Sequence, residues 1–235
     1  MDGKRVYVDT VRRLRSGLDA FGVLAVLDRH VDRRPVHYLR SQFAIYDFQD
    51  LANLDSPWWS YAAIDVVDAW LGNKPHARAF EWGSGASTLW LEKRAAEVIS
   101  VEHDVAFAED VRQIAAANTT LITVEAVKTP TPSIGSERAG HEGLDFSDYV
   151  HAIDTFDDDF DLICIDGRAR VACLDAALSH LKSDGIIVFD NSERPRYQPA
   201  IGRSDVSVET HRSWAPALPT RSSTSIIRPA LESSH

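Results

Sequence analysis

The stretch AFEWGSGASTLWL, residues 79–91, decides the fold. A short apolar run carries the acidic residue Glu81, and the chain then passes through Gly83 and Gly85 into a helix-forming sequence. Glycines at these places permit a tight turn and the close approach of a ligand, and the first turn of a helix offers free backbone N–H groups. The stretch therefore predicts a strand, a ligand-binding loop and a helix, in that order.

Short β-rich runs alternate with helical stretches on both sides of this loop. Strands are expected at 77–82, 98–102, 121–127, 161–166 and 186–191, with helices between them reaching residues 97, 117 and 182. Such alternation predicts βαβ units and a parallel sheet. Two further β-like runs, 206–210 and 223–228, are expected to form an antiparallel pair that closes the sheet, and the polar segment 129–143 a surface loop.

Residues 1–56 precede the alternating pattern. Apolar residues at helical spacing, among them Val11, Leu14 and Leu18, predict an amphipathic helix over 8–30. A second helix is expected over 57–71. We expect residues 1–56 to form a helical cap or a homodimer contact, and residues 57–235 to form the main α/β domain.

Composition limits the partners. The 235 residues carry a net charge of −10, which argues against a nucleic acid because binding its backbone requires clustered cations. No apolar run approaches the roughly 20 residues that a membrane span needs, and no apolar stretch marks a signal peptide. Cys164 and Cys173 are expected to be buried thiols in a reducing compartment. These features favour a cytoplasmic protein without a membrane partner.

Glu102 closes the second predicted strand, roughly 20 residues beyond the glycine loop, where Rossmann-type sites place a carboxylate on the ribose hydroxyls. A carboxylate suits that position because it accepts hydrogen bonds from both hydroxyls. His103 follows, and either stacks near an adenine ring or is a plain loop residue.

The glycine loop resembles the first motif of the class I S-adenosylmethionine-dependent methyltransferases, which reads acid-x-Gly-x-Gly. Glu81, Gly83 and Gly85 match that motif, whereas the dinucleotide fingerprint wants a third glycine where Thr88 stands. The resemblance implies S-adenosylmethionine as cofactor and a doubly wound, mostly parallel seven-stranded sheet. Glu81 would then lie near the methionine end of the cofactor, with Gly83, Gly85, Ser87, Glu102 and His103 as its other binding residues.

Three oxygen-bearing side chains follow the next predicted strands. Asp166 ends the fourth strand, and Asp190 and Asn191 end the fifth. This arrangement resembles the metal-dependent O-methyltransferases of the catechol and caffeoyl-CoA type, in which such residues hold a divalent ion. The resemblance implies a metal site formed by Asp166, Asp190 and Asn191, with Mg²⁺ as a second cofactor. The alternative is that these residues only form a helix cap and a turn.

One departure from those enzymes concerns proton transfer. They carry a lysine soon after the first aspartate, whereas Arg168 and Arg170 follow here. Arginine stays protonated and is a poor general base, but it binds carboxylate or phosphate well. We therefore expect Arg168 and Arg170 to orient a small anionic acceptor, with Asp166 and Asp190 as the other catalytic candidates. If no metal is used, the base would be Asp190 or a histidine such as His141.

Methyl transfer to an oxygen of a small molecule, with or without a metal, is the function that these motifs favour. Two other classes stay open: a nicotinamide-dependent oxidoreductase, against which the missing third glycine argues, and a binding module without catalysis. The aromatic residues Trp58, Trp59 and Tyr61 either line a lid over the cofactor or pack in the core.

Overall fold

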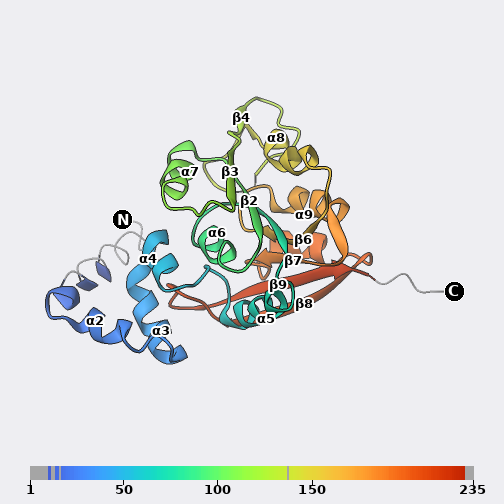
Figure 1. Cartoon of the computed structure of the whole chain (residues 1–235). Helices are drawn as coiled ribbons and strands as arrows, with labels where there is room; N and C mark the ends of the chain where they lie inside the picture. The colour runs from blue at the N-terminus through green and yellow to red at the C-terminus, as the bar shows by residue number, and fades with distance from the viewer. Residues whose placement is uncertain (1–9, 12–13, 16, 137, 231–235) are drawn as a thin grey trace.

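The computed structural model describes residues 10–11, 14–15, 17–136 and 138–230. Its centre is a seven-stranded sheet of order β3-β2-β1-β6-β7-β9-β8 (Figure 1). The strands are β1 (Arg78–Trp82), β2 (Glu97–Glu102), β3 (Thr119–Thr123), β6 (Phe160–Ile165), β7 (Leu181–Asp190), β8 (Val206–Trp214) and β9 (Arg221–Pro229). The first five of these in chain order run parallel, and β9 pairs antiparallel with both β7 and β8. The predicted doubly wound sheet and its antiparallel closing pair are confirmed.

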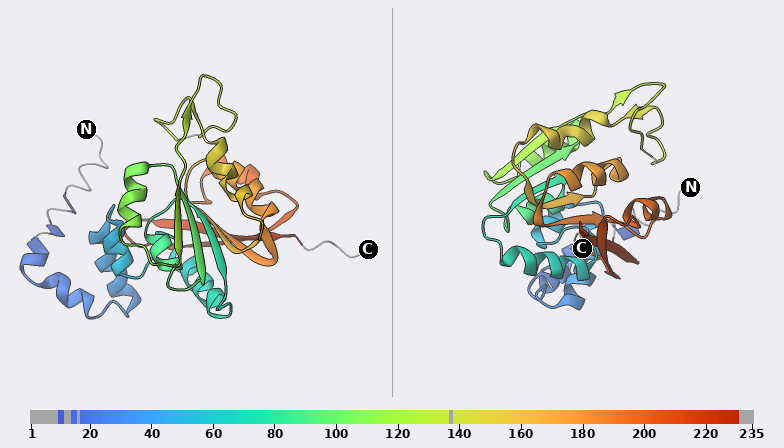
Figure 2. Two further views of the ribbon diagram at one scale, coloured as in Figure 1. Left: turned by 45° about the horizontal axis from the view of Figure 1, so that its top comes forward. Right: turned by 90° about the vertical axis from the view of Figure 1, so that its right-hand side faces the viewer.

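Helices cover both faces of the sheet (Figure 2). Alternate residues of β6 belong to different core clusters, with Ile163 and Ile165 in one and Leu162 and Cys164 in the other. Both faces of the strand are therefore buried, as in other parallel α/β sheets. The helices are α2 (Val23–Asp28), α3 (Arg34–Ser41), α4 (Phe48–Asn53), α5 (Tyr61–Gly72), α6 (Ala86–Leu91), α7 (Val105–Arg112), α8 (Ser147–Val150), α9 (Arg170–Ser179) and α10 (Gln198–Ile201).

Short elements complete the chain. A two-stranded ribbon of β4 (Val127–Lys128) and β5 (Leu144–Asp145) brackets the polar segment predicted as a surface loop. The 3₁₀ turns are η1 (Gln42–Ala44), η2 (His151–Thr155) and η3 (Pro195–Tyr197). The carboxyl ends of β1, β2, β6 and β7 lie at one edge of the sheet, because these strands are parallel.

Several predicted bounds were wrong. The helix expected over 8–30 is interrupted at Gly22, whose φ of +70° is a left-handed conformation that glycine adopts without strain. Parts of that expected helix lie outside the described residues. Helix α5 begins at Tyr61, beyond Pro57, because the Ser60 hydroxyl accepts a hydrogen bond from the backbone N–H of Ala63 and caps the helix there.

The strand and helix ends beyond the glycine loop also differ. Helix α6 ends at Leu91 and α7 at Arg112, both shorter than predicted. Strand β7 already begins at Leu181, and the 183–185 segment predicted as a turn lies within it, next to a shift in the pairing with β6. Cys164 and Cys173 are buried and unbonded, as predicted. Across the described residues, no helix combines the length and apolar character needed to cross a bilayer.

Candidate active site

The glycine loop between β1 and α6 is built by close backbone contact. Gly83 has a φ of +99°, and a Cβ atom there would lie 2.8 Å from the backbone of Gly167. The loops that follow β1 and β6 therefore touch, and only a glycine fits at the contact. Gly85, with a φ of +151°, is the N-cap of α6. These positions confirm the predicted order of strand, loop and helix.

Thr88 explains why no third glycine is needed. Its hydroxyl oxygen accepts a hydrogen bond from the Gly85 backbone N–H at 2.9 Å and donates to the carboxylate of Glu81. The Ser87 hydroxyl donates to the other oxygen of Glu81 at 2.9 Å. A third glycine would let the helix pack closely against the strand. The side chain of Thr88 instead links β1, the loop and α6 through hydrogen bonds.

Glu81 is completely buried and lies beneath the loop. Burial raises the pKa of its carboxyl to about 7, and the hydrogen bonds from Thr88, Ser100 and Ser87 oppose that rise. Glu81 lines neither of the two cavities described below. Its carboxylate therefore supports the first turn of α6, by accepting hydrogen bonds from Ser87 and Thr88.

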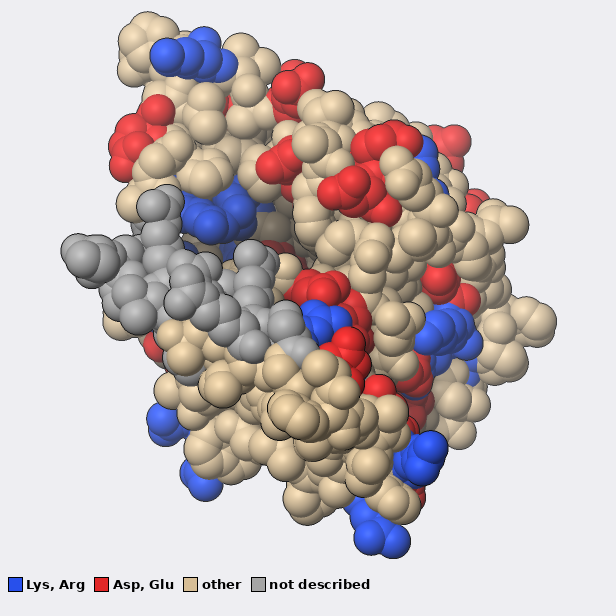
Figure 3. Space-filling model, turned by 90° about the vertical axis from the view of Figure 1, so that its left-hand side faces the viewer, with Lys and Arg blue, Asp and Glu red and all other residues tan. Residues whose placement is uncertain are grey.

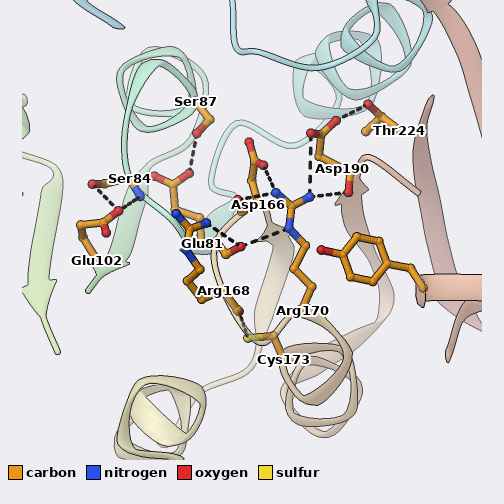
Figure 4. A network of polar contacts seen from close by, with 12 residues as sticks. Glu81, Ser84, Ser87, Glu102, Asp166, Arg168, Arg170, Cys173, Asp190 and Thr224 are labelled. Carbon is orange, nitrogen blue, oxygen red and sulfur yellow. Dashed lines mark hydrogen bonds and ion pairs between the residues drawn. The ribbon is translucent and has the colours of Figure 1, made fainter. Parts of the chain in front are cut away.

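Glu102 connects the end of β2 to the glycine loop (Figure 4). Its Oε2 accepts from the Ser84 backbone N–H at 3.0 Å and from the Ser84 hydroxyl at 3.3 Å. Its Oε1 accepts from the backbone N–H groups of His103 and Asp104 at 2.8 and 2.9 Å. Burial acts to raise the pKa of Glu102, but hydrogen bonds from His103 and Asp104 hold it below its ordinary value. Glu102 is therefore a buried carboxylate in its ionised form.

Two cavities open at this edge of the sheet. The smaller has a volume of about 230 Å³, and the glycine loop, from Ser84 to Ser87, forms one of its walls. The larger has a volume of about 800 Å³ and lies against the loops after β6 and β7, residues 133–136 and Arg138. Tyr46, Trp58 and Asp166 line both cavities, so the two meet at these side chains.

Residues of the N-terminal segment take part in the smaller cavity. Tyr46, Phe48 and Leu51 contribute to its wall, together with Phe107 of α7. Of the three aromatic residues considered for a lid, Trp58 lines both cavities, whereas Trp59 and Tyr61 are buried in the core. Sequence reasoning missed Tyr46 and Phe48, because nothing in their local pattern connects them to the glycine loop.

Five arginines line the larger cavity: Arg138, Arg168, Arg170, Arg194 and Arg196. Figure 3 shows Lys and Arg side chains gathered in a hollow on one face of the molecule. Among the described residues, no carboxylate forms an ion pair with Arg138, Arg168 or Arg194. Burial and the neighbouring Arg138 lower the pKa of Arg168. The cavity is thus strongly cationic although the chain as a whole is acidic.

The segment 129–143, expected only to be a surface loop, supplies one wall of this cavity through Ser133 and Arg138. His141 stacks on Phe146 and accepts a hydrogen bond at Nε2 from Nε of Arg168 at 3.3 Å. His141 lines neither cavity, and its Nε2 is occupied by this contact with Arg168. His103 lies beside it, with 5.9 Å between the ring centres.

The three residues expected to hold a metal lie at the same edge of the sheet. Asp166, Asp190 and Asn191 all line the larger cavity. The guanidinium of Arg170, however, lies between the two aspartates (Figure 4). Its Nη2 donates to Oδ1 of Asp166 at 2.6 Å, and its Nη1 lies 3.9 Å from Oδ2 of Asp190. Asp190 also accepts a hydrogen bond from the Thr224 hydroxyl at 2.8 Å.

This arrangement does not fit a divalent ion. A metal between the two carboxylates would meet the fixed positive charge of Arg170 at hydrogen-bond distance from Asp166. Held by the two aspartates, Arg170 is also not free to orient an anionic acceptor, contrary to the expectation from the sequence.

The fold and this site can be compared with solved structures. The O-methyltransferase TomG from Streptomyces achromogenes, in complex with SAM, is 15% identical over 77% of this chain and 88% of its own, with a TM-score of 0.52. The O-methyltransferase from Bacillus cereus, in complex with SAH, is 15% identical over 77% and 90%, with a TM-score of 0.56. Cofactor-bound Rv0187 from MTB is 16% identical over 77% and 87%, with a TM-score of 0.55.

No protein-family model matches the sequence, and neither does any curated protein. The solved O-methyltransferases nevertheless match the fold of this chain over about three quarters of its length, with TM-scores of 0.52 and 0.56. The chain therefore has the fold of the class I methyltransferases, as its glycine motif predicted.

Proposed function

We propose that this protein is an S-adenosylmethionine-dependent methyltransferase that acts on an oxygen atom of a small anionic acceptor. The observation that carries the proposal is the junction of the two cavities at Tyr46, Trp58 and Asp166. Methyl transfer needs a donor and an acceptor held end to end, and the smaller cavity lies against a glycine loop and a helix N-terminus suited to the donor.

The cofactor, when bound, supplies an electrophilic methyl group on a sulfonium sulfur. Glu102 lines neither cavity itself, but it holds Ser84, which lines the smaller one, and we expect it to accept hydrogen bonds from the ribose hydroxyls once the Ser84 hydroxyl moves aside. Its carboxylate already accepts hydrogen bonds from three backbone N–H groups and from the Ser84 hydroxyl, and its Oε1 also lies 2.5 Å from Nδ1 of His103. The contact with the Ser84 hydroxyl, at 3.3 Å, is the longest of these. We expect a ribose hydroxyl to displace the Ser84 hydroxyl while the three backbone N–H groups keep the carboxylate in place.

Asp190 is the proposed general base. It lines the acceptor cavity, and burial together with the nearby Asp166 raises the pKa of its carboxyl to about 8. A carboxylate of that pKa takes a proton from a hydroxyl more readily than an ordinary aspartate. The acceptor oxygen would form its bond to the methyl carbon as the carbon–sulfur bond breaks, and the hydroxyl proton would pass to Asp190. Thr224 positions Asp190 through its hydrogen bond.

The arginines of the larger cavity support an anionic acceptor. Arg168 and Arg194 have no carboxylate partner among the described residues, so their charges are free to meet a carboxylate or phosphate of the ligand. Arginine is suited to this because its planar guanidinium binds such groups through two hydrogen bonds.

The proposal also includes a cytoplasmic location, a division of the chain at residue 56 and a homodimer contact through the N-terminal segment.

Calorimetric titration tests the cofactor. S-adenosylhomocysteine should bind and NAD should not; the opposite result would favour the nicotinamide-dependent oxidoreductase. A methyl-acceptor panel of hydroxy acids, each paired with its neutral amide, then tests the reaction. Turnover of the acids and not of the amides is expected, whereas cofactor binding without any turnover would favour a non-catalytic binding module.

A further inference from the structure

The guanidinium of Arg170 lies in a cage of oxygen atoms. Its Nη2 donates to the carbonyl oxygen of Asp166 at 2.7 Å as well as to the carboxylate of the same residue at 2.6 Å. Its Nε donates to the carbonyl oxygen of Gly167 at 3.2 Å. Its Nη1 donates to the carbonyl oxygen of Asp190 and lies 3.9 Å from the Asp190 carboxylate. Five oxygen atoms from the ends of β6 and β7 thus surround one cation.

Carboxylate and backbone carbonyl oxygens are the ligands that hard divalent cations take in proteins. Here the same kinds of oxygen are committed to a side chain that cannot lose its charge at any ordinary pH. The side chain of Arg170 is almost completely buried, so it is a fixed part of the cavity floor. Its position follows from the chain, because Ala169 in a left-handed conformation, with a φ of +48°, turns the chain into α9 directly before it.

We propose that Arg170 takes the place of a divalent cation in this site, so that the chain supplies from α9 the positive charge that a metal would otherwise bring. The inference rests on the oxygen cage and not on the proposed reaction. It has two consequences. The wild-type protein binds no divalent ion between Asp166 and Asp190, and removal of the guanidinium turns the cage into a site for one.

The neighbouring Arg168 provides the contrast. It lines the same cavity, but its Nε faces His141, and it forms no ion pair with a carboxylate among the described residues. Removing Arg168 also removes one positive charge from the cavity. It leaves the cage filled, and it should therefore create no metal site.

Metal binding is best measured directly, with Mn²⁺ as the probe and electron paramagnetic resonance as the readout of free ion. We expect no binding to the wild-type protein, one Mn²⁺ bound to Arg170→Ala and to Arg170→Met, and none to Arg168→Ala. The double variant Arg170→Ala with Asp166→Asn should lose the new site. Thermal unfolding should show the same pattern, with Mg²⁺ raising the Tm of the Arg170 variants only.

Two outcomes would overturn the proposal. One is that the wild-type protein binds one Mn²⁺ and the Asp166→Asn variant does not. The guanidinium would then move aside for a metal. The other is an Arg170 variant that is folded by circular dichroism and still binds no Mn²⁺. If neither Arg170 variant folds, the wild-type titration and its Asp166→Asn counterpart decide alone. Since none of these readouts involves methyl transfer, their failure is separate from a failure of the proposed function.

Discussion

The hydroxyl oxygen of Thr88 lies 2.9 Å from the backbone nitrogen of Gly85, so a side chain completes the turn into α6. The same hydroxyl donates to the buried carboxylate of Glu81. One residue therefore links the end of β1, the glycine loop and the first turn of the helix. This link connects the stability of the fold to the shape of the glycine loop, which forms one wall of the smaller cavity.

Thr88→Val tests that link, because valine keeps the shape of threonine and removes both hydrogen bonds. We expect the free energy of unfolding to fall by about 1–3 kcal/mol, since a buried N–H and a buried carboxyl each lose a partner. Affinity for S-adenosylhomocysteine should fall as well. Denaturant unfolding and calorimetry measure the two effects. Thr88→Ser, which retains the hydroxyl, is the control, and equal losses in both variants would contradict this role.

Glu102→Ala should weaken S-adenosylhomocysteine binding by about 1–3 kcal/mol, which corresponds to roughly 5- to 150-fold in Kd. The physical reason is the loss of the ribose acceptor together with the carboxylate that holds Ser84 in place. Calorimetry gives the affinity directly. The exposed Glu125→Ala is the matched control and should bind normally. An affinity of Glu102→Ala within a factor of two of the wild-type value would show that Glu102 does not bind the ribose.

Glu81 predicts a pH dependence of stability. Its pKa rises from 4.5 in the unfolded chain to about 7 when buried, so the folded state binds the extra proton between these values. The free energy of unfolding should therefore fall as pH rises from 4.5 to 7 and then stay level, by an amount on the order of 1–3 kcal/mol. Glu81→Gln removes this contribution and should gain stability relative to wild type over that window. Urea unfolding across the range, with the exposed Glu125→Gln as control, measures it; parallel curves for wild type and Glu81→Gln would refute the assignment.

Asp190→Asn tests the proposed base. We expect kcat to fall on the order of 10²- to 10⁴-fold while S-adenosylhomocysteine binds as in wild type. Because the base must be deprotonated to act and its pKa is about 8, wild-type kcat should rise with pH up to that region. The rising limb should be lost in Asp190→Asn. A variant that keeps the full rate, or the same pH profile at a lower rate, would assign the proton to another group.

Arg168→Ala and Arg194→Ala test acceptor binding. Each removes one guanidinium from the larger cavity, and we expect the KM for an anionic acceptor to rise about 10-fold or more, with little change in cofactor affinity. Steady-state kinetics on an acid and its neutral amide separate a loss of charge recognition from a general loss of enzyme activity, because only the KM for the acid should rise. The exposed Arg29→Ala, which lies outside the cavity, is the control. Equal effects on both acceptors would remove the case for an anionic substrate.

Much of the fold was predictable because it depends on local patterns. The alternation of apolar runs with helical stretches gave the parallel strands, and two short β-like runs gave the closing pair β8 and β9. Helix ends were predicted less well. The Ser60 hydroxyl sets the start of α5 by accepting a backbone hydrogen bond, and Gly22 interrupts the N-terminal helix with its left-handed φ. Neither feature changes the apolar periodicity from which the helices were predicted.

The sequence by itself determined the class of fold and the position of the glycine loop, because the turn geometry depends on residues that are adjacent in the chain. It also placed Asp166 and Asp190 at neighbouring strand ends. Only the tertiary structure showed that the guanidinium of Arg170 lies between those aspartates, because the local sequence pattern does not predict where a side chain at the start of α9 points. The same holds for the larger cavity, where Tyr46, Arg138 and Arg194 come from three distant segments. The positions of these charged and aromatic side chains depend on tertiary packing, which brings together residues that are far apart in the sequence.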